Sequence, residues 1–269
     1  MAKRVMIINP PSAERPLRKR LERSYTESLY SFLLTNKHRM VNKILERYAK
    51  EVKSNLNLLE ELIQLLDVTP FQDLPYRLQK QYEELSRDSM LLSLRAIKEQ
   101  VSLNEYIDLL NLANDMAVEF AREKSMELVG KKILEDGTIV DNPNAVWRID
   151  EATRDLLKGD LARALEEGWS SRQLAQYWQG SDSVAFSKVR AERIARTEIA
   201  RADIEAHNEA WRKSGVVRSK VWLISEDPCE LCSENYAQGV IDFNDEFENG
   251  DPPVHPNCTC DVAGVTEVE

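Results

Sequence analysis

The chain ends in a compact set of soft metal ligands. All four cysteines lie in the last forty or so residues, in the order Cys229-x-x-Cys232 and then His255-x-x-Cys258-x-Cys260. The 22 residues between the two clusters include two glycines and the pair Pro252-Pro253, which favour turns. Two closely spaced ligand pairs joined by a turn-rich loop are typical of a small structural zinc site. We therefore expect this ending to fold around Zn²⁺.

Five candidate ligands compete for the four positions of a tetrahedral zinc site. The Cys229-x-x-Cys232 pair can converge on one ion, and His255-x-x-Cys258 repeats that spacing. If residues 258–260 are extended, Cys258 and Cys260 point the same way, so the sequence leaves open which of them completes the site. A site filled by four protein ligands is closed and therefore structural. About fifty acidic, turn-rich residues bury little core, so the ion would contribute much of their folding free energy.

The composition is that of a globular protein without a membrane span. The chain has 269 residues, of which 42% are apolar and 30% charged, and only nine glycines, which argues against an all-β fold. No stretch approaches the roughly 20 apolar residues of a membrane helix. The apolar run near the start, Val5 to Ile8, is too short for a secretory signal. We expect a cytosolic chain with reduced, metal-binding cysteines, although four cysteines leave disulfide pairing open.

Charge is distributed unevenly along the chain. Residues 1–50 contain twelve Lys and Arg against four Asp and Glu, whereas residues 221–269 contain twelve acids and no Lys or Arg. A polyanion would be repelled by the C-terminal module and attracted to the beginning of the chain. Any contact with DNA is therefore expected at a basic N-terminal arm, residues 1–16, and at the start of the next helix. The candidate residues are Arg15, Arg18, Lys19, Arg20 and Arg23.

Residues 17–149 are predicted to form a helical domain. Leucines and tyrosines recur every three or four residues from 17 to 66, a pattern that fits one helix or two helices broken near residues 35–36. A second helix is predicted over 76–98. A third begins at the capping box Ser102-x-x-Glu105 and is followed by a hairpin signal between 133 and 140.

Residues 150–215 are predicted to form three closely spaced helices, over 150–167, 171–179 and 184–213. On the last of these, six small or apolar residues form one narrow face that implies close packing: Ala191, Ile194, Ala195, Ile199, Ala202 and Ala206. From Val216 the sequence changes to β-forming residues that lead to Cys229. The fold class expected is therefore mainly α, an elongated helical body, with a small C-terminal β-rich zinc-binding module at 216–269.

The module also admits a catalytic interpretation. A cysteine nucleophile needs a general base, and the other histidines are His38 and His207. His207 lies off the narrow alanine face and is predicted to be an exposed helical residue. A zinc-supported hydrolase or nuclease that uses His255 with nearby acids is the alternative function, although these acids show no diagnostic spacing.

The second half of the chain resembles a known family. The residues that carry the resemblance are Arg190-Ala-Glu-Arg-Ile-Ala-Arg-Thr-Glu-Ile-Ala-Arg201, the Trp211-x-x-x-Gly215 turn, Asp227-Pro-Cys-Glu-Leu-Cys232, and Pro252-Pro-Val-His-Pro-Asn-Cys-Thr-Cys260. Together they are similar to the phage Mu F-like minor head proteins, also called the phage head morphogenesis family. The resemblance covers about Asp150 to Asp261. Thr259 stands where the family's usual Cys-Arg-Cys ending has arginine.

The resemblance implies a minor capsid protein of a tailed phage or prophage. Such a protein associates with the portal protein during head assembly, in the host bacterial cytoplasm, and ends in the virion, at the portal vertex or in the capsid interior. The scaffold or major capsid protein and DNA are further expected partners, and a membrane is not. Binding rather than catalysis would be its work.

The charged residues of the helix over 184–213 have two interpretations. Arg190, Arg193, Thr197 and Arg201 fall on one side of it, with Arg196 at the edge. Interleaved acids favour ordinary solvent-facing ion pairs over a polar stripe that docks on the portal or on phosphates.

Overall fold

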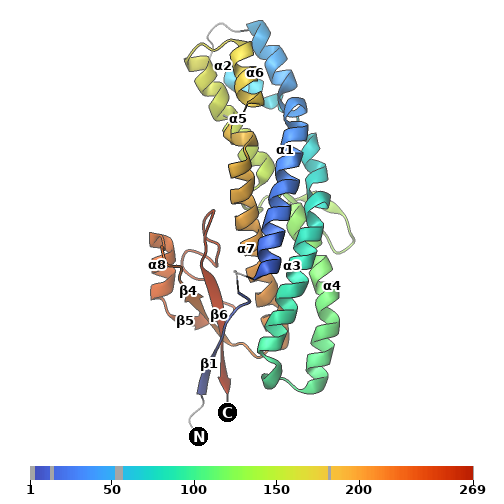
Figure 1. The fold of residues 1–269 in the computed structure, drawn as a ribbon, viewed down its shortest axis with the longest axis vertical. Coiled ribbons are helices and arrows are strands. Elements are labelled where there is room, and N and C mark those ends of the chain that lie inside the picture. The colour runs from blue at the N-terminus through green and yellow to red at the C-terminus, as the bar shows by residue number, and fades with distance from the viewer. Residues whose placement is uncertain (1–3, 13–14, 52–56, 181–182, 269) are drawn as a thin grey trace. The chain divides into compact units, whose positions relative to one another are not determined.

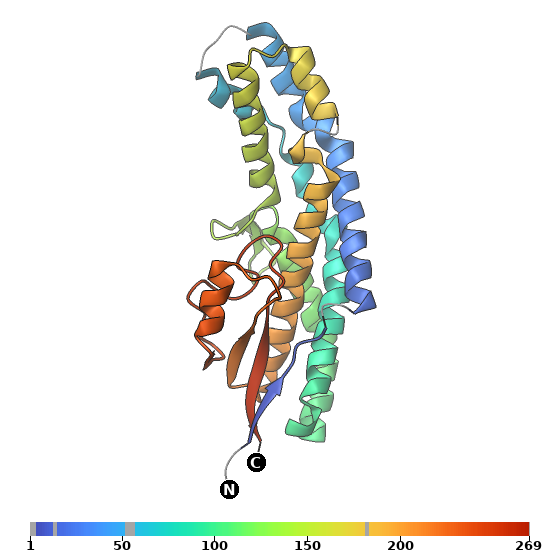
Figure 2. The same cartoon turned by 60° about the vertical axis from the view of Figure 1, so that its left-hand side comes forward.

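The computed structural model describes residues 4–12, 15–51, 57–180 and 183–268. Long helices dominate it, together with one four-stranded and one two-stranded sheet (Figures 1 and 2). The fold class predicted from the sequence is confirmed: the protein is mainly helical, with a small antiparallel sheet and a Cys/His cluster near its C-terminus. No helix within the described ranges is both long and apolar enough to cross a membrane.

The chain divides into two compact units, and each is assembled from separate stretches of sequence. Unit 1 contains Met1–Arg23, Lys80–Arg122 and Arg193–Glu269, and unit 2 contains Ser24–Gln79 and Glu123–Glu192. The predicted segments 1–16, 17–149, 150–215 and 216–269 are consecutive in sequence, and the units combine parts of them. The long helices bring distant stretches together, which a composition profile does not reveal.

The sheet of unit 1 has the strand order β1-β6-β4-β5, and all its neighbouring strands are antiparallel. Its strands are β1 (Arg4–Ile8), β4 (Ser219–Leu223), β5 (Val240–Asp242) and β6 (Asp261–Val268). β1 pairs with β6 in the register Ile8 to Gly264. Residues 4–8 are therefore an edge strand of this sheet and not an extended arm. The burial of their side chains alternates as expected for a strand with one face on the core. Met6 and Ile8 face the core, and Val5 and Ile7 face outward.

Three long helices share a core with this sheet in unit 1, in whole or in part. They are α3 (Leu74–Ala96), α4 (Leu103–Glu127) and α7 (Lys188–Ser214). A core cluster joins these helices to one face of the sheet through Leu94, Ala113, Trp211 and Ile8. The predicted small-residue face of α7 is buried at Ala191, Ala195, Ile199, Ala202 and Ala206, and Ile194 is half-buried.

Gly264 permits β6 to approach α7 closely. A Cβ at this position would lie 3.0 Å from Val217 Cγ1 and 3.3 Å from Trp211 Cε3. Gly159, within the helix over 149–166, has no such neighbour within 4 Å. We expect Gly264→Val to lower the free energy of unfolding by about 1–3 kcal/mol through overpacking. Gly159→Ala should instead raise it by up to about 1 kcal/mol, because alanine favours helix. Denaturant titration of both variants checks the contrast, and an unaffected Gly264→Val protein would contradict it.

Unit 2 contains most of the remaining helices. They are α1 (Pro16–Glu51, from residue 24), α2 (Asn57–Gln64), α5 (Ile149–Glu166) and α6 (Ser171–Gln179), with the hairpin β2 (Lys131–Ile133) and β3 (Ile139–Asp141). Among the described residues, 3₁₀ turns lie between helices at Thr69–Asp73 and Val184–Phe186 of unit 2 and at Lys98–Gln100 of unit 1. α1 runs unbroken through residues 35–36, so the predicted stretch 17–66 has no break there, and it includes the separate helices α1 and α2. The hydroxyl of Tyr48 donates to the carbonyl of Trp169 (3.0 Å), and the indole of Trp178 donates to Asp160 (3.1 Å).

Local sequence signals placed several helix ends correctly. Ser170 and Gln173 form a reciprocal capping box at the start of α6, and Ser102 and Glu105 do so at the start of α4. Gly215, with φ +65, follows the last residue of α7. These signals act within a few residues of sequence, so they need no knowledge of the tertiary fold.

Candidate metal centre

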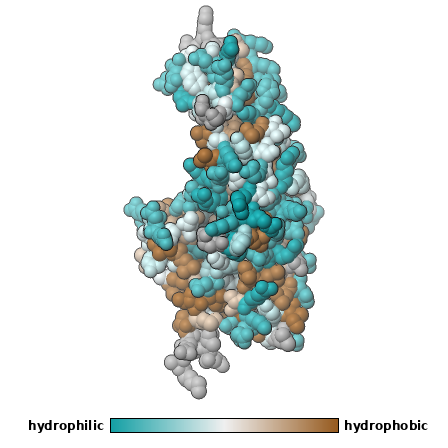
Figure 3. Space-filling model, in the orientation of Figure 1, coloured by the Kyte–Doolittle hydropathy of each residue, from teal (hydrophilic) through white to brown (hydrophobic). Residues whose placement is uncertain are grey.

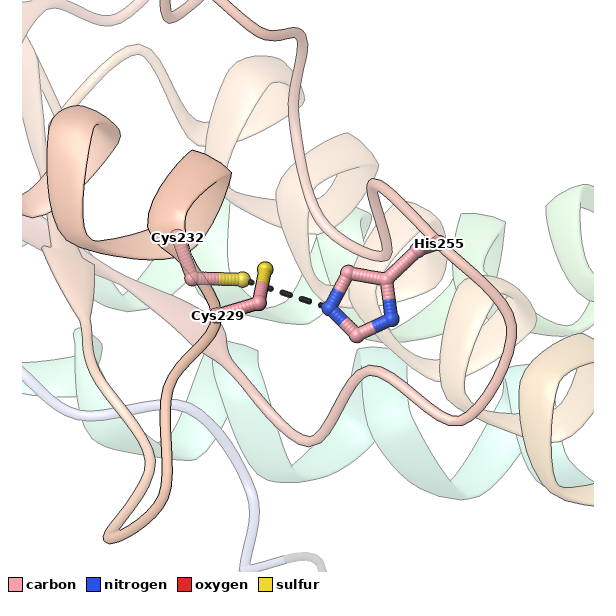
Figure 4. A group of neighbouring side chains, drawn as sticks. All are labelled: Cys229, Cys232 and His255. Carbon is pink, nitrogen blue, oxygen red and sulfur yellow. Dashed lines mark hydrogen bonds between the residues drawn. The ribbon is translucent and has the colours of Figure 1, made fainter.

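The five predicted ligands come from a short helix and a loop of unit 1. Cys229 occupies the N-cap position of α8 (Glu230–Ala237), and Cys232 lies in its first turn. A helical turn after Cys229 brings the two thiols to the same end of the helix. His255 reaches toward them from the loop before β6, as Figure 4 shows. The same loop contains Cys258 and Cys260.

The distances around Cys232 fit a tetrahedral ion. Its Sγ lies 3.5 Å from Nε2 of His255 and 3.8 Å from Sγ of Cys258. Zinc bonds of about 2.3 Å to sulfur and 2.0–2.1 Å to nitrogen imply tetrahedral edges of roughly 3.8 Å for S···S and 3.5 Å for S···N. Both separations therefore match the edges that an ion between these atoms would require.

The donors form two groups that share Cys232. Cys229, Cys232 and His255 form one group and Cys232, Cys258 and Cys260 the other, with donor atoms within 4.8 Å of one another in each. Among the described residues, no carboxylate joins either group. The arrangement thus offers thiolate and imidazole ligands, the donor set of a structural zinc site.

His255 is oriented by its own loop. Its Nδ1–H donates to the carbonyl oxygen of Pro256 (3.0 Å), because a carbonyl can only accept. Nε2 then carries the free lone pair, and Figure 4 shows this nitrogen facing the sulfur of Cys232. A hydrogen bond to the second ring nitrogen commonly fixes the tautomer of a ligating histidine. His255 is therefore prepared to bind a metal through Nε2.

Cys260 differs from the other thiols in its contacts. Its Sγ lies within hydrogen-bond distance of Ser225 Oγ, at 3.6 Å. A hydrogen bond between Cys258 and Cys260 lowers the pKa of Cys260 to about 5 and raises the pKa of Cys258. Burial raises the pKa of Cys232 to about 12. Without a cation the buried cluster disfavours several thiolates side by side, so metal binding would release protons.

The module is held by a small core beneath the ligands. Cys232, Cys258 and Cys260 pack with Ile204 of α7 and with three residues of the module: Trp222, Phe247 and Val262. The rings of Trp222 and Phe247 meet edge to face, with centroids 5.1 Å apart. The cysteines therefore contribute to the packing as well as to the donor set.

Asn235 and Asn257 hold the loops around the ligands in place, two roles that the sequence pattern does not predict. The buried side chain of Asn235 donates to the carbonyl of Gly250 and accepts from the backbone of Asn249, both at 3.0 Å. The N–H of Asn257, whose φ is +65, donates to Oγ1 of Thr197 on α7 (3.0 Å). The only sequence signal for the role of Asn257 is the residue type itself, because asparagine tolerates the left-handed backbone region that this position adopts.

Two of the predicted DNA-contact residues form ion pairs with a buried carboxylate of the protein. Arg15 and Arg18 each approach the buried carboxylate of Asp203 at 2.7 Å, and Arg15 also pairs with Asp88 (2.7 Å). Burial alone would raise the pKa of Asp203, but Arg18 and Arg15 outweigh it and lower that pKa. Lys19, Arg20 and Arg23 are exposed on α1, where Arg20 pairs with Glu84. The exposed members of the predicted set are thus these three.

His207 is fully buried, so the expectation of an exposed helical histidine is wrong. Burial lowers the pKa of its imidazole to about 4, and its Nε2 lies 3.5 Å from Asp261. Its ring also packs on Trp211 at 4.8 Å. β6 and the N-terminal segment cover this side of α7, which the helical pattern alone did not reveal.

The charged residues of α7 divide into buried and exposed members. Arg190 is buried in unit 2, where it donates to the carbonyl of Ala185 and to the hydroxyl of Thr153, and burial lowers its pKa to about 10. In unit 1 Arg193 and Arg196 are exposed, and Arg196 donates to Asn257 Oδ1 (3.2 Å). The expected solvent-facing set therefore holds for Arg193 and Arg196 and is wrong for Arg190 and Thr197, which are buried. Arg201 is half-buried and lies 3.7 Å from Glu198.

Comparisons of the chain with family models, with curated proteins and with solved structures found no match.

Proposed function

We propose that Cys229, Cys232, His255 and Cys258 hold a structural Zn²⁺. The two tetrahedral edges at Cys232 support this set. Cys258 is preferred over Cys260 as the fourth ligand because Cys260 is engaged with Ser225. A bound ion would cross-link α8 to the loop before β6. Two hydrogen-bonded groups of the protein position the loops around the ion: Asn235 holds the loop over 249–250, and the carbonyl of Pro256 orients His255.

We propose further that the protein is a minor head protein of a tailed phage or prophage that binds the portal during head assembly. The supporting observation is that separate pieces of the family-like sequence contact one another. Thr197 and Arg196 of the α7 segment hydrogen-bond Asn257 of the His-Pro-Asn-Cys-Thr-Cys segment. From Arg193 onward the family-like pieces lie in unit 1, and contacts between separate pieces of the resemblance are what a shared fold predicts. The virion would be its final location.

Contact with DNA is the second part of this proposal and rests on fewer residues than the sequence suggested. Arg15 and Arg18 neutralise Asp203, so Lys19, Arg20 and Arg23 are the exposed candidates. Three contacts would give a log–log salt slope of about −3 at most. The portal contact is therefore the principal function proposed, and DNA binding is secondary.

Co-purification with the portal tests the proposed function directly. The tagged full-length chain is expressed with the portal protein encoded by the same phage or prophage, and in parallel with the portal of an unrelated phage as the control. We expect the cognate portal alone to co-purify with the chain. Capture of both portals, or of neither, would overturn the proposal. Heads assembled normally without the chain would also contradict a role in morphogenesis.

A further inference from the structure

A buried lysine lies on the core face of the sheet beside the candidate metal centre. Lys220 is in the middle of β4, where it pairs with Ile241 of β5 on one side and with Gly264 of β6 on the other. Its side chain shares a face with that of Trp222, because residues two apart in a strand point the same way, and only 3% of Lys220 is exposed. A side chain that starts from a strand paired on both sides is a rigid anchor for the group that it binds.

The ammonium group of Lys220 binds the loop that leads to His255. Its Nζ lies 2.5 Å from Oδ2 of Asp251 and 5.6 Å from the centroid of the Phe247 ring. The other carboxylate oxygen of Asp251, Oδ1, is buried and has no hydrogen-bond partner among the described residues. Lys220 is therefore the group that holds this carboxylate in place, four residues before His255.

Packing alone does not account for a lysine at this position. Figure 3 shows hydrophobic residues gathered over the part of the molecule where Figure 1 places the sheet, and the core face of β4 is apolar at Trp222 as well. Replacing a buried ion pair with well-packed apolar residues is often neutral or stabilising. What lysine adds over an apolar side chain is a directional, charge-assisted contact with one carboxylate. Residues 221–269 contain no Lys or Arg, so the rest of the module has no base to replace it.

The loop is held on both sides of His255. After the histidine, the N–H of Asn257 donates to Oγ1 of Thr197 on α7 (3.0 Å). Before it, the carboxylate of Asp251 is held by Lys220. The imidazole therefore projects from the short stretch 252–256, which is fixed at both ends, and this stretch determines how far Nε2 reaches toward the thiols of α8.

We infer that Lys220 is a positioning residue of the metal centre, which sets through Asp251 where His255 stands relative to the cysteines. The inference rests on the proposed zinc site. Asn235 holds residues 249–250 independently of the lysine. Loss of the Lys220 contact would therefore displace the imidazole and leave the loop attached to α8. Contacts just outside a ligand shell commonly change metal affinity by about 10–100-fold.

The test compares the metal affinity and the cobalt spectrum of full-length variants. Lys220→Met keeps an unbranched apolar stem and removes the ammonium group. We expect its zinc dissociation constant, measured by chelator competition, to rise about 10–100-fold. The visible spectrum of its Co²⁺-loaded form should move from that of the parent toward that of His255→Ala, in which the imidazole ligand is absent. An affinity and a spectrum equal to those of the parent would overturn the inference.

Further variants separate positioning from a general effect on folding. Asp251→Asn removes the charge on the loop side and should weaken zinc in the same direction, which keeps the inference testable if Lys220→Met does not fold. Lys131→Met breaks an exposed ion pair of the same 2.5 Å length with Asp141 in unit 2 and should leave the zinc affinity unchanged. Leu94→Ala destabilises the other core cluster of unit 1 and should leave the cobalt spectrum unchanged.

Each outcome assigns the failure to one proposal. A cobalt spectrum that changes in Leu94→Ala as it does in Lys220→Met would overturn the positioning role, because any loss of stability would then produce it. A parent chain that binds neither zinc nor cobalt would overturn the proposed centre itself. Variants that match a metal-binding parent would overturn the inference about Lys220 alone.

Discussion

Replacing Cys232 with serine is expected to abolish metal binding and to unfold the C-terminal module. Cys232 is the one donor common to both ligand groups, and it is buried in the small core with Trp222 and Phe247. A structural zinc site contributes its binding free energy to folding, so removal of a central ligand removes both. We expect the zinc content to fall from about one ion per chain to near zero. Elemental mass spectrometry reports the loss of zinc, and tryptophan fluorescence, to which Trp222 contributes, reports the loss of packing in the module.

Cys260→Ser is the matched control, because Cys260 lies in the same loop and bonds Ser225 in place of the proposed ion. This variant should retain about one zinc per chain. Chelation of the parent protein should reproduce the effect of Cys232→Ser and should leave the helices of unit 2 intact. Stoichiometric zinc in Cys232→Ser would refute the proposed centre. Loss of zinc from Cys260→Ser, with a folded module, would instead make Cys260 the fourth ligand.

Replacing Asp203 with asparagine is expected to lower the free energy of unfolding by about 3–5 kcal/mol. Asp203 is fully buried, and its carboxylate receives both Arg15 and Arg18 at 2.7 Å. Removal of its charge leaves two guanidinium groups without their main counterion in a poorly solvated place. Denaturant titration at neutral pH measures the loss. Glu84→Gln, which removes the exposed partner of Arg20, should change stability by less than about 1 kcal/mol.

The effect of Asp203→Asn should depend on pH in one direction. The pKa of Asp203 is lower in the folded protein than its ordinary value of 3.8. A depressed carboxyl pKa stabilises the folded state above the unfolded pKa, and this contribution is lost as the pH falls through the folded pKa. The difference between parent and variant should therefore be largest near neutrality and should shrink below about pH 4. A difference that grows on acidification would contradict the ion-pair account.

Hydrogen-bond signals that span a few residues made parts of the fold predictable. The capping boxes at Ser102 and Ser170 and the glycine after α7 each act within their own turn, so they marked helix ends correctly. The apolar run from Val5 to Ile8 is equally local, but it predicts only part of an N-terminal arm. A strand is defined by its partner, and the partner of β1 is β6, about 260 residues away.

The sequence by itself determined the ligand types of the candidate centre and the two pairs that supply them. Cys-x-x-Cys and His-x-x-Cys fix donor identity and local spacing, and thiolates and imidazole select a soft metal site before any fold is known. Only the tertiary structure decided which donors meet around Cys232, that Arg15 and Arg18 face Asp203, and that His207 is buried. The physical reason is that each of these facts depends on packing between segments far apart in sequence. The local pattern of a helix specifies which residues share a face and does not specify what covers it.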